Sequence, residues 1–203
     1  MIRIIDYGLG NISAFLNVYK RLNIAATAAK TVDELQGATK LILPGVGAFD
    51  HAMELLNRSG MRETVDDLVI RQRMPVLGIC VGMQILAKSS EEGKAEGLGW
   101  ISGEVKGFRS LNRPNLILPH MGWNDVTPTA GSHLFAGLEH DARFYFLHSF
   151  YFECARPQDV AASSSYGTEF HCAVHADNIY GVQFHPEKSH HYGTQLLKNF
   201  AEL

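Results

Sequence analysis

The stretch Met74-Pro-Val-Leu-Gly78-Ile-Cys80-Val-Gly82-Met-Gln84 decides the fold. A short apolar run ends in Gly-x-Cys-x-Gly, and the residues after it predict a helix that continues to Ala87. This pattern is typical of a nucleophile elbow, a sharp turn from a strand into a helix with a cysteine at its centre. The flanking glycines remove side chains that would clash in such a turn, and the helix N-terminus favours a thiolate.

The alternative interpretation of Cys80 is a buried structural thiol, because free cysteines are among the most buried residues. A core cysteine does not need glycines two residues before and two residues after it, so the spacing favours a nucleophile. A nucleophile in turn requires a base, and the base requires a group that orients it. The sequence near the C-terminus offers both groups.

There, Val182–Phe184 is predicted to be a strand that leads into His185. Two residues apart on extended chain, His185 and Glu187 would share one face, with roughly 7 Å between their Cα atoms. Pro186 favours extended backbone at His185. Glu187 would then accept the imidazole N–H while the other ring nitrogen faces the nucleophile. Alone, His-x-Glu is more often a solvated strand end. Its weight comes from the chain order, in which the nucleophile precedes the base and the acid.

Composition limits the function classes. The chain has 203 residues, 18 basic and 21 acidic side chains and a net charge of −3. This predicts one domain, residues 1–203, with a sizeable core. No basic stripe suggests nucleic acid or an anionic membrane as a partner, and no apolar run approaches a membrane span. The start of the chain does not resemble a secretory signal, and three cysteines without CxxC spacing predict neither a disulfide framework nor a zinc site. A cytoplasmic location is expected.

Alternating apolar patterns predict an α/β fold, with an open, doubly wound, mostly parallel sheet covered by helices on both faces. After Gly97, short segments with Gly, Pro and Asn turns predict antiparallel additions in the C-terminal half. The expected strands in the N-terminal part are Arg3–Asp6 and Lys40–Leu43. The expected helices are Ile12–Leu22, Ala48–Leu56, Met61–Gln72 and Tyr192–Glu202.

A glycine-rich turn, Asp6-Tyr-Gly8-Leu-Gly10-Asn11, invites a dinucleotide-binding interpretation. That fingerprint requires a third glycine where this chain has Ser13, and an acid at the end of the next strand, where Asp33 and Glu34 instead open a helix. The turn is therefore expected to be a tight connection between a strand and a helix.

Together, Gly78-Ile-Cys80-x-Gly82-Met-Gln84 and Gly181-x-Gln183-Phe-His185-Pro-Glu187 resemble the two signatures of class I glutamine amidotransferase domains. Five further segments narrow the resemblance to the HisH family, the glutaminase subunits of imidazole glycerol phosphate synthase. They are Asp6–Asn11, Leu43–Gly47, Pro119–Asn124, Tyr145–Ser149 and Pro186–Ser189. The resemblance spans the whole chain.

It implies that glutamine is hydrolysed to glutamate and ammonia by a triad of Cys80, His185 and Glu187. The oxyanion of the tetrahedral intermediate would be held by the amide of Val81 and by one amide of the Pro44–Gly47 loop, that of Val46 or Gly47. Residues expected to form the glutamine pocket are Gly45, Gly82, Gln84, His148, Ser149 and Phe150. This chemistry requires no cofactor. His190 and His191 are adjacent and point apart, so no metal is expected there.

One domain uses up the chain, so the acceptor of the ammonia must lie on a separate subunit. The resemblance implies a (β/α)₈-barrel synthase that forms a heterodimer with this chain and makes imidazole glycerol phosphate and AICAR in histidine biosynthesis. The residues expected at the interface are Asn11, Trp123, Tyr145 and Lys188. For Trp123 and Tyr145 the alternative is a place in the core.

Three other functions stay open. The first is a paralogous glutaminase subunit that feeds ammonia to another biosynthesis, such as amidation of a surface-polysaccharide sugar. The second is a stand-alone cysteine hydrolase of related fold, such as a γ-glutamyl hydrolase or a small peptidase. The third is a non-catalytic partner protein, which the intact triad residues disfavour.

Overall fold

The computed structural model describes all of residues 1–203. Parallel strands form one half of the large sheet, in the order β2-β1-β3-β4-β13. Their backbones are hydrogen-bonded to both neighbours except at the β2 edge, and β3 and β4 are buried along nearly their whole length. In chain order these strands are β1 (Ile2–Ile5), β2 (Ala26–Ala29), β3 (Lys40–Gly45), β4 (Val76–Cys80) and β13 (Ile179–Val182).

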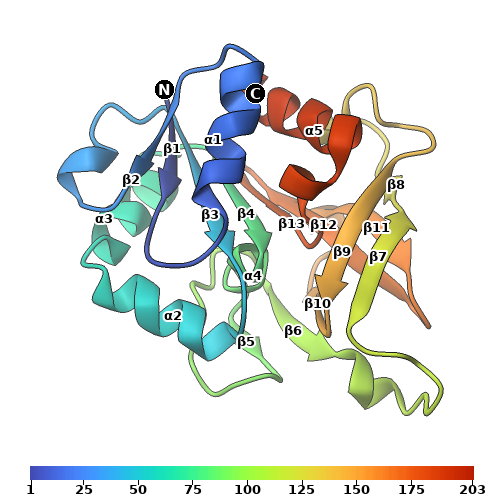
Figure 1. The fold of residues 1–203 in the computed structure, drawn as a ribbon. Helices are drawn as coiled ribbons and strands as arrows, with labels where there is room; N and C mark the ends of the chain where they lie inside the picture. The colour runs from blue at the N-terminus through green and yellow to red at the C-terminus, as the bar shows by residue number, and fades with distance from the viewer.

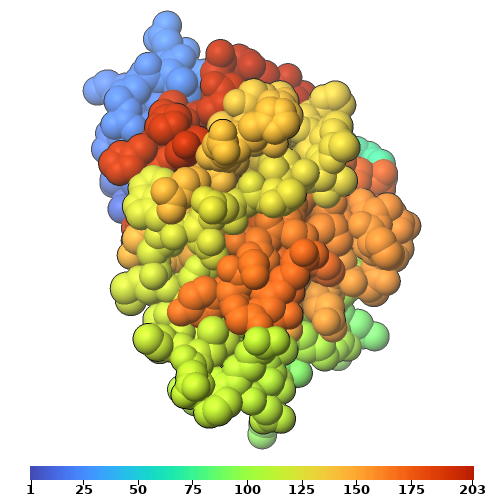
Figure 2. Space-filling model, turned by 90° about the vertical axis from the view of Figure 1, so that its right-hand side faces the viewer, coloured from blue at the N-terminus to red at the C-terminus, as the bar shows by residue number.

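Beyond β13 the same sheet continues through β12, β10, β6 and β5, with antiparallel pairing from β13 to β6. Strands β8 and β11 extend it at the side of β12, while β7 and β9 form a separate two-stranded antiparallel sheet. Figure 2 shows β11 and β12 in orange above the yellow-green segment that joins β6 to β7. These strands are β5 (Ser89–Ser90), β6 (Gly103–Gly107), β7 (His120–Asp125), β8 (Thr127–Pro128), β9 (Arg143–His148), β10 (Phe150–Cys154), β11 (Val160–Ser165) and β12 (Glu169–Ala176).

Helices cover both faces of the parallel strands (Figure 1). On one face α1 lies beside α5, where the Tyr19 hydroxyl donates to the Leu197 carbonyl at 3.2 Å. The right-handed crossovers place α2 and α3 on the opposite face, because β1 leads outward to β2 whereas β3 leads inward to β4. The helices are α1 (Ile12–Arg21), α2 (Phe49–Arg58), α3 (Arg62–Asp66), α4 (Val81–Gln84) and α5 (His190–Glu202). This confirms the expected doubly wound α/β fold.

Short helical turns complete the chain. Five are 3-10 turns: η1 (Asp33–Leu35), η3 (Phe108–Leu111), η4 (His133–Phe135), η5 (Pro157–Asp159) and η6 (Pro186–Lys188). The sixth, η2 (Asp67–Arg71), is a π-helical turn that follows α3 directly. No helix has the length and apolar character needed to cross a membrane.

Several predicted boundaries were wrong by one or two residues, and three larger differences stand out. The segment expected to be a helix over Met61–Gln72 is helical from Arg62 to Arg71, but its second half is the π turn η2. The strand expected at Val182–Phe184 instead ends at Val182. Strand β2 was not predicted, because its sequence Ala-Thr-Ala-Ala has weak strand propensity and is only half-buried.

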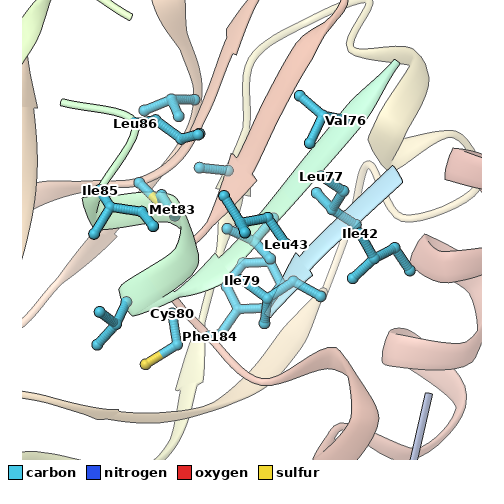
Figure 3. Close-up of a cluster of buried hydrophobic side chains, with 14 of the residues drawn as sticks. Ile42, Leu43, Val76, Leu77, Ile79, Cys80, Met83, Ile85, Leu86 and Phe184 are labelled. Carbon is cyan, nitrogen blue, oxygen red and sulfur yellow. The ribbon is translucent and has the colours of Figure 1, made fainter. Parts of the chain in front are cut away.

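One cluster of 52 buried residues runs through the molecule and surrounds the ends of β3 and β4. Figure 3 shows Ile42, Leu77 and Ile79 in this cluster, with Cys80 at its edge. Strand β4 therefore runs through the core and ends with Cys80 at the edge of the core.

Candidate active site

Cys80 sits on a sharply turned backbone between β4 and α4. Its φ is +56° and its ψ is −114°, a conformation that costs a non-glycine residue about 1–3 kcal/mol. A Cβ on Gly82 would lie 1.9 Å from the Leu43 carbonyl oxygen, and one on Gly78 would lie 2.6 Å from the Gly82 oxygen. Both glycines are therefore required by close backbone contacts. In Figure 3 the sulfur of Cys80 points away from the aliphatic cluster.

The helix after Cys80 is shorter than the sequence predicts, because it ends at Gln84 and not at Ala87. The Leu98 and Ile101 N–H groups, from the segment before β6, donate to the Ile85 and Leu86 carbonyls. Those carbonyls are thus satisfied from outside the helix. One turn of helix carries only a small dipole.

His185 and Glu187 meet, but not on extended chain. His185 is extended, with φ −102° and ψ 93°, whereas Glu187 lies in the 3-10 turn η6, which has Pro186 in its first turn. The turn shortens the span, so that Nδ1 of His185 lies 2.9 Å from Oε1 of Glu187. Both side chains are almost fully buried, at 3% and 4% exposure. The prediction of an extended His-x-Glu pair was therefore wrong in backbone, although the two side chains do pair.

Strand β9 and Ser189 hold this turn in place. The His185 N–H donates to the Tyr145 carbonyl at 2.9 Å, and the Ser189 hydroxyl donates to the His185 carbonyl at 2.6 Å. The Tyr145 N–H donates back to the Ser189 hydroxyl at 3.0 Å. Strand β9 thus anchors the base directly, and Ser189 at the start of α5 ties the turn to the same strand.

The pKa of His185 is raised to about 9 by its neighbours. Burial alone would lower it, but hydrogen bonds with Cys80 and Glu187, and the negative charge that each can carry, outweigh the desolvation. The imidazole therefore holds both protons at neutral pH. A ring in that state can give a proton to a leaving amine, provided that the sulfur has already given up its own.

A cavity of about 300 Å³ opens at the Cys80 sulfur. It is lined by both His185 and Cys80, and by seven of the other predicted residues: Val46, Gly47, Val81, Gln84, His148, Ser149 and Phe150. Three lining residues had not been assigned to the site, namely Glu92, Pro119 and Leu147, and Lys188, which was predicted for the interface, lines the cavity as well. A larger and more open depression between Phe108 and Leu118 contains none of the predicted residues.

Gly45 and Gly82 do not line the cavity. A Cβ on Gly45 would lie 2.5 Å from the Gly82 backbone nitrogen, so the two glycines allow β3 and α4 to touch. The two glycines thus support the pocket through this backbone contact and do not form its wall.

Glu92 contributes a carboxylate to the cavity wall. Its Oε2 accepts the Phe49 N–H at 2.8 Å and so satisfies a donor at the start of α2, where Ala48 offers no side-chain cap. Burial raises the pKa of this carboxyl and the nearby Asp50 adds to the rise, while the Phe49 N–H opposes it. No periodic pattern in the sequence marks Glu92, because its position depends on this contact with α2.

The Pro44–Gly47 loop lies over the cavity. Tyr7 donates its hydroxyl to the Pro44 carbonyl at 2.7 Å, which fixes the start of the loop. Beyond that point Val46 is 43% exposed and Gly47 has φ +94°. Neither the Val46 N–H nor the Gly47 N–H donates to another group of the chain. Both amides are available to a ligand in the cavity.

Of the predicted interface residues, only Lys188 lines the cavity, and two others lie beside it. Trp123 and Tyr145 are directly opposite each other on β7 and β9, and the Lys188 ammonium lies 5.8 Å from the Tyr145 ring centre. Trp123 is 41% exposed and stacks on His190. Asn11 is the N-cap of α1, because its side chain accepts the Ala14 N–H at 3.1 Å.

The other cysteines differ from Cys80. Cys154 is half-buried and Cys172 is fully buried, and all three thiols are free. Burial raises the pKa of Cys154 to about 12 and that of Cys172 still further. Neither lines the cavity. No group of three or more His, Cys, Asp or Glu side chains is arranged to hold a metal ion.

A family model described as glutamine amidotransferase class-I matches residues 4–203. The chain therefore belongs to the class-I glutamine amidotransferases. Within that family it is similar, over the full length of both chains, to proteins named imidazole glycerol phosphate synthase subunit HisH. That of Bdellovibrio bacteriovorus is 63% identical and that of Leptospira interrogans is 55% identical.

Solved structures agree with this fold. A crystal structure of a glutamine amidotransferase superposes with a TM-score of 0.77 at 21% identity, covering 99% of this chain and 97% of that one. The structure of PurLQS from Thermotoga maritima gives a TM-score of 0.75 at 16% identity, covering 99% of this chain and 97% of that one.

Proposed function

We propose that this chain, as one domain of residues 1–203, is the glutaminase subunit of an imidazole glycerol phosphate synthase. One observation carries the proposal: the strained Cys80 elbow and the buried His185–Glu187 pair meet at a single closed-in cavity. Full-length similarity to HisH subunits supports the choice of this synthase among the users of ammonia.

In the proposed reaction the Cys80 sulfur, as thiolate, attacks the side-chain amide carbon of glutamine. The carbonyl oxygen becomes an oxyanion, which the Val81 amide and an amide of Val46 or Gly47 stabilise. His185 gives a proton to the amide nitrogen, the C–N bond breaks, and ammonia leaves a glutamyl thioester. Water then attacks the thioester while His185 takes a proton, and glutamate is released. Glu187 orients the imidazole throughout.

Charge in the cavity fits this substrate. Glu92 offers a carboxylate to the α-ammonium group of glutamine, and Lys188 offers an ammonium at the rim. Ser149 and Phe150 form part of the cavity wall. We place the side-chain amide of glutamine over Cys80 and its α-ammonium group toward Glu92.

The ammonia requires a protected path, because free ammonia at neutral pH becomes ammonium, which is not a nucleophile. We propose that a (β/α)₈-barrel synthase subunit docks over Trp123, Tyr145 and Lys188, where the cavity opens. A cytoplasmic location belongs to the proposal, because three free thiols fit a reducing compartment.

The test is reconstitution with the barrel subunit from the same organism. Glutamine should support formation of imidazole glycerol phosphate from the ribulosyl-phosphate intermediate, and a glutamine-analogue electrophile should label Cys80 and stop that synthesis. If the chain binds a different synthase and leaves the barrel inactive with glutamine, the assignment to this synthase is wrong. If the electrophile labels no residue, the assignment of glutaminase activity to this chain is wrong.

A further inference from the structure

Two buried histidines outside the triad form a continuous hydrogen-bonded pair. His120 begins β7 and His148 ends β9, and the two residues are direct partners in the register of that sheet. Nδ1 of His120 lies 2.8 Å from Nε2 of His148. The His120 ring is stacked between Tyr166, at 4.0 Å between ring centres, and Phe146, at 4.8 Å. Aromatic packing therefore fixes the plane of the ring and the direction of its nitrogens.

The partners at the two ends fix where the protons lie. His148 Nδ1 is 2.8 Å from the Phe150 carbonyl oxygen, which can only accept, so this nitrogen carries a proton. At the other end, the Asn124 Nδ2 is 3.2 Å from His120 Nε2. The same amide donates to the Ser165 carbonyl, and its oxygen accepts the Asp125 N–H, which sets its orientation. Asn124 therefore donates to His120.

Only one arrangement of neutral rings satisfies all these contacts. Asn124 donates to Nε2 of His120, His120 donates from Nδ1 to Nε2 of His148, and His148 donates from Nδ1 to the Phe150 carbonyl. Burial agrees with uncharged rings, because it lowers the pKa of His120 to about 4 and that of His148 to about 3. A proton on Nε2 of His148 would face the His120 donor and reverse the chain against Asn124.

The Phe150 carbonyl joins this pair to the nucleophile. It also accepts Nε2 of Gln84 at 3.1 Å, and the same Gln84 nitrogen donates to the Gln183 side-chain oxygen at 3.0 Å. The Gln183 Nε2 lies 3.9 Å from the Cys80 sulfur. Gln84 was expected to contribute its side-chain amide to the glutamine pocket, and the nitrogen of that amide already donates to these two acceptors.

We propose that His120 is a positioning residue for the glutaminase, which holds His148 in its Nδ1–H form and thereby fixes the Phe150 carbonyl and the pocket wall at Ser149–Phe150. His120 itself does not line the cavity. The inference rests on the proposed function, since it assumes that glutamine occupies this cavity.

Two consequences follow for the chemistry. Both ring nitrogens of His148 are engaged in hydrogen bonds. The side chain therefore forms part of the cavity wall but offers no free nitrogen that could act as a base in competition with His185. A neutral His148 also adds no positive charge to the wall of a cavity that is proposed to hold the ammonium group of glutamine. His185 thus transfers protons in the reaction, whereas His148 and His120 each keep one proton on Nδ1.

Kinetics in the reconstituted complex test the proposal with a matched pair of variants. His120→Phe keeps a flat ring between Tyr166 and Phe146 but removes the donor, and it should raise the KM for glutamine about tenfold. His120→Asn can place its Nδ2–H near the position of the lost Nδ1–H, and it should restore much of that loss. Synthesis from ammonium salts should stay within about twofold of wild type in both.

A control separates this effect from loss of any stacked histidine. His175 stacks on Tyr180 at 4.3 Å between ring centres and has no contact with the cavity. His175→Phe should leave the KM for glutamine unchanged. An equal rise in KM for His175→Phe and His120→Phe, or a wild-type KM in His120→Phe, would overturn the positioning role.

Nitrogen-15 NMR of the histidine rings provides a readout that needs no activity and no mutation. In the wild-type protein at pH 7, His148 should be neutral with its proton on Nδ1, and this preference should be lost in His120→Phe. A proton on Nε2 of wild-type His148 refutes the proposal even if His120→Phe does not fold. If the tautomer is as expected but wild-type protein hydrolyses no glutamine with its partner, the proposed function fails separately.

Discussion

The Nδ1 atom of His185 lies 2.9 Å from Oε1 of Glu187, although only Pro186 separates the two residues in the chain. The 3-10 turn after Pro186 brings the carboxylate back under the ring, so a tripeptide supplies both the base and its orienting group. Because Nδ1 is engaged, Nε2 is the ring nitrogen left to face Cys80. The triad geometry therefore depends on one turn and on the strand that anchors it.

Loss of the nucleophile should separate two activities. Cys80→Ala or Cys80→Ser should reduce glutamine-dependent synthesis by roughly three orders of magnitude or more, while synthesis from ammonium salts continues on the partner. His185→Ala should behave similarly, and Glu187→Gln should retain more activity. Cys154→Ala is the control, since its thiol lies outside the cavity and should change neither rate. Equal loss of both activities in Cys80→Ala would mean that the cysteine is structural.

Stability should depend on pH through His185. Its pKa is about 9 in the folded protein against an ordinary value of 6.5, so proton binding favours the folded state. That contribution is complete below pH 6.5 and is lost as pH rises through 9. Urea unfolding at pH 6 and pH 9.5 should show a larger loss of stability for wild type than for His185→Gln. The same loss in both proteins would contradict this assignment.

The loop amides predict a rate that depends on the partner. Val46 and Gly47 have free N–H groups, but nothing within the chain holds either of them toward the cavity. The isolated chain should therefore bind glutamine yet hydrolyse it about 10²–10³-fold more slowly than the complex, the value of one oxyanion donor. Gly47→Ala should reduce the rate of the complex, because its φ of +94° disfavours any side chain, although a Cβ there meets no atom within 4 Å. Stopped-flow or coupled glutamate assays measure both rates, and equal rates with and without the partner would exclude the idea.

Lys188 should affect association more than folding. It forms no ion pair within the chain, and its ammonium lies over Tyr145 at the cavity mouth. Lys188→Glu should weaken heterodimer formation or uncouple glutaminase from synthase, while the melting temperature of the isolated chain changes little. Lys20→Glu, an exposed position near the far end of α1, serves as the control. If Lys188→Glu destabilises the isolated chain and leaves association intact, the docking face lies elsewhere.

Removal of one charge should weaken glutamine binding. Glu92→Gln keeps an oxygen that can accept the Phe49 N–H, but it removes the carboxylate offered to the substrate ammonium. The KM for glutamine should rise about tenfold to a hundredfold, as expected for a hydrogen bond to a charged group, with a smaller change in kcat. An unchanged KM would place the amino-acid end of glutamine at another wall.

Local sequence patterns predicted the elbow and the alternation of strands and helices, because both depend on residues close together in the chain. Cys80 with its glycines, and the apolar runs of β3 and β4, are of this kind. Glu92 could not be found in this way, since it reaches the cavity only through a contact with α2. His120 lies within the Pro119–Asn124 segment, but no local pattern indicated its contacts, because its partners come from β9 and from the segment around Tyr166. The backbone of Glu187 was mispredicted because Pro186 suits a 3-10 turn as well as it suits extended chain.

The contact between Gly45 and Gly82 also bears on how the site can switch. With no side chain on either residue, the end of β3 rests directly on the backbone that carries the nucleophile, and neither can shift without the other. Any reorientation of the oxyanion loop is thus confined to the peptide planes after Gly45. Activation then needs no hinged lid or domain closure. We expect it to be a rotation of one or two amides on a fixed frame, which contact with the partner subunit could bring about.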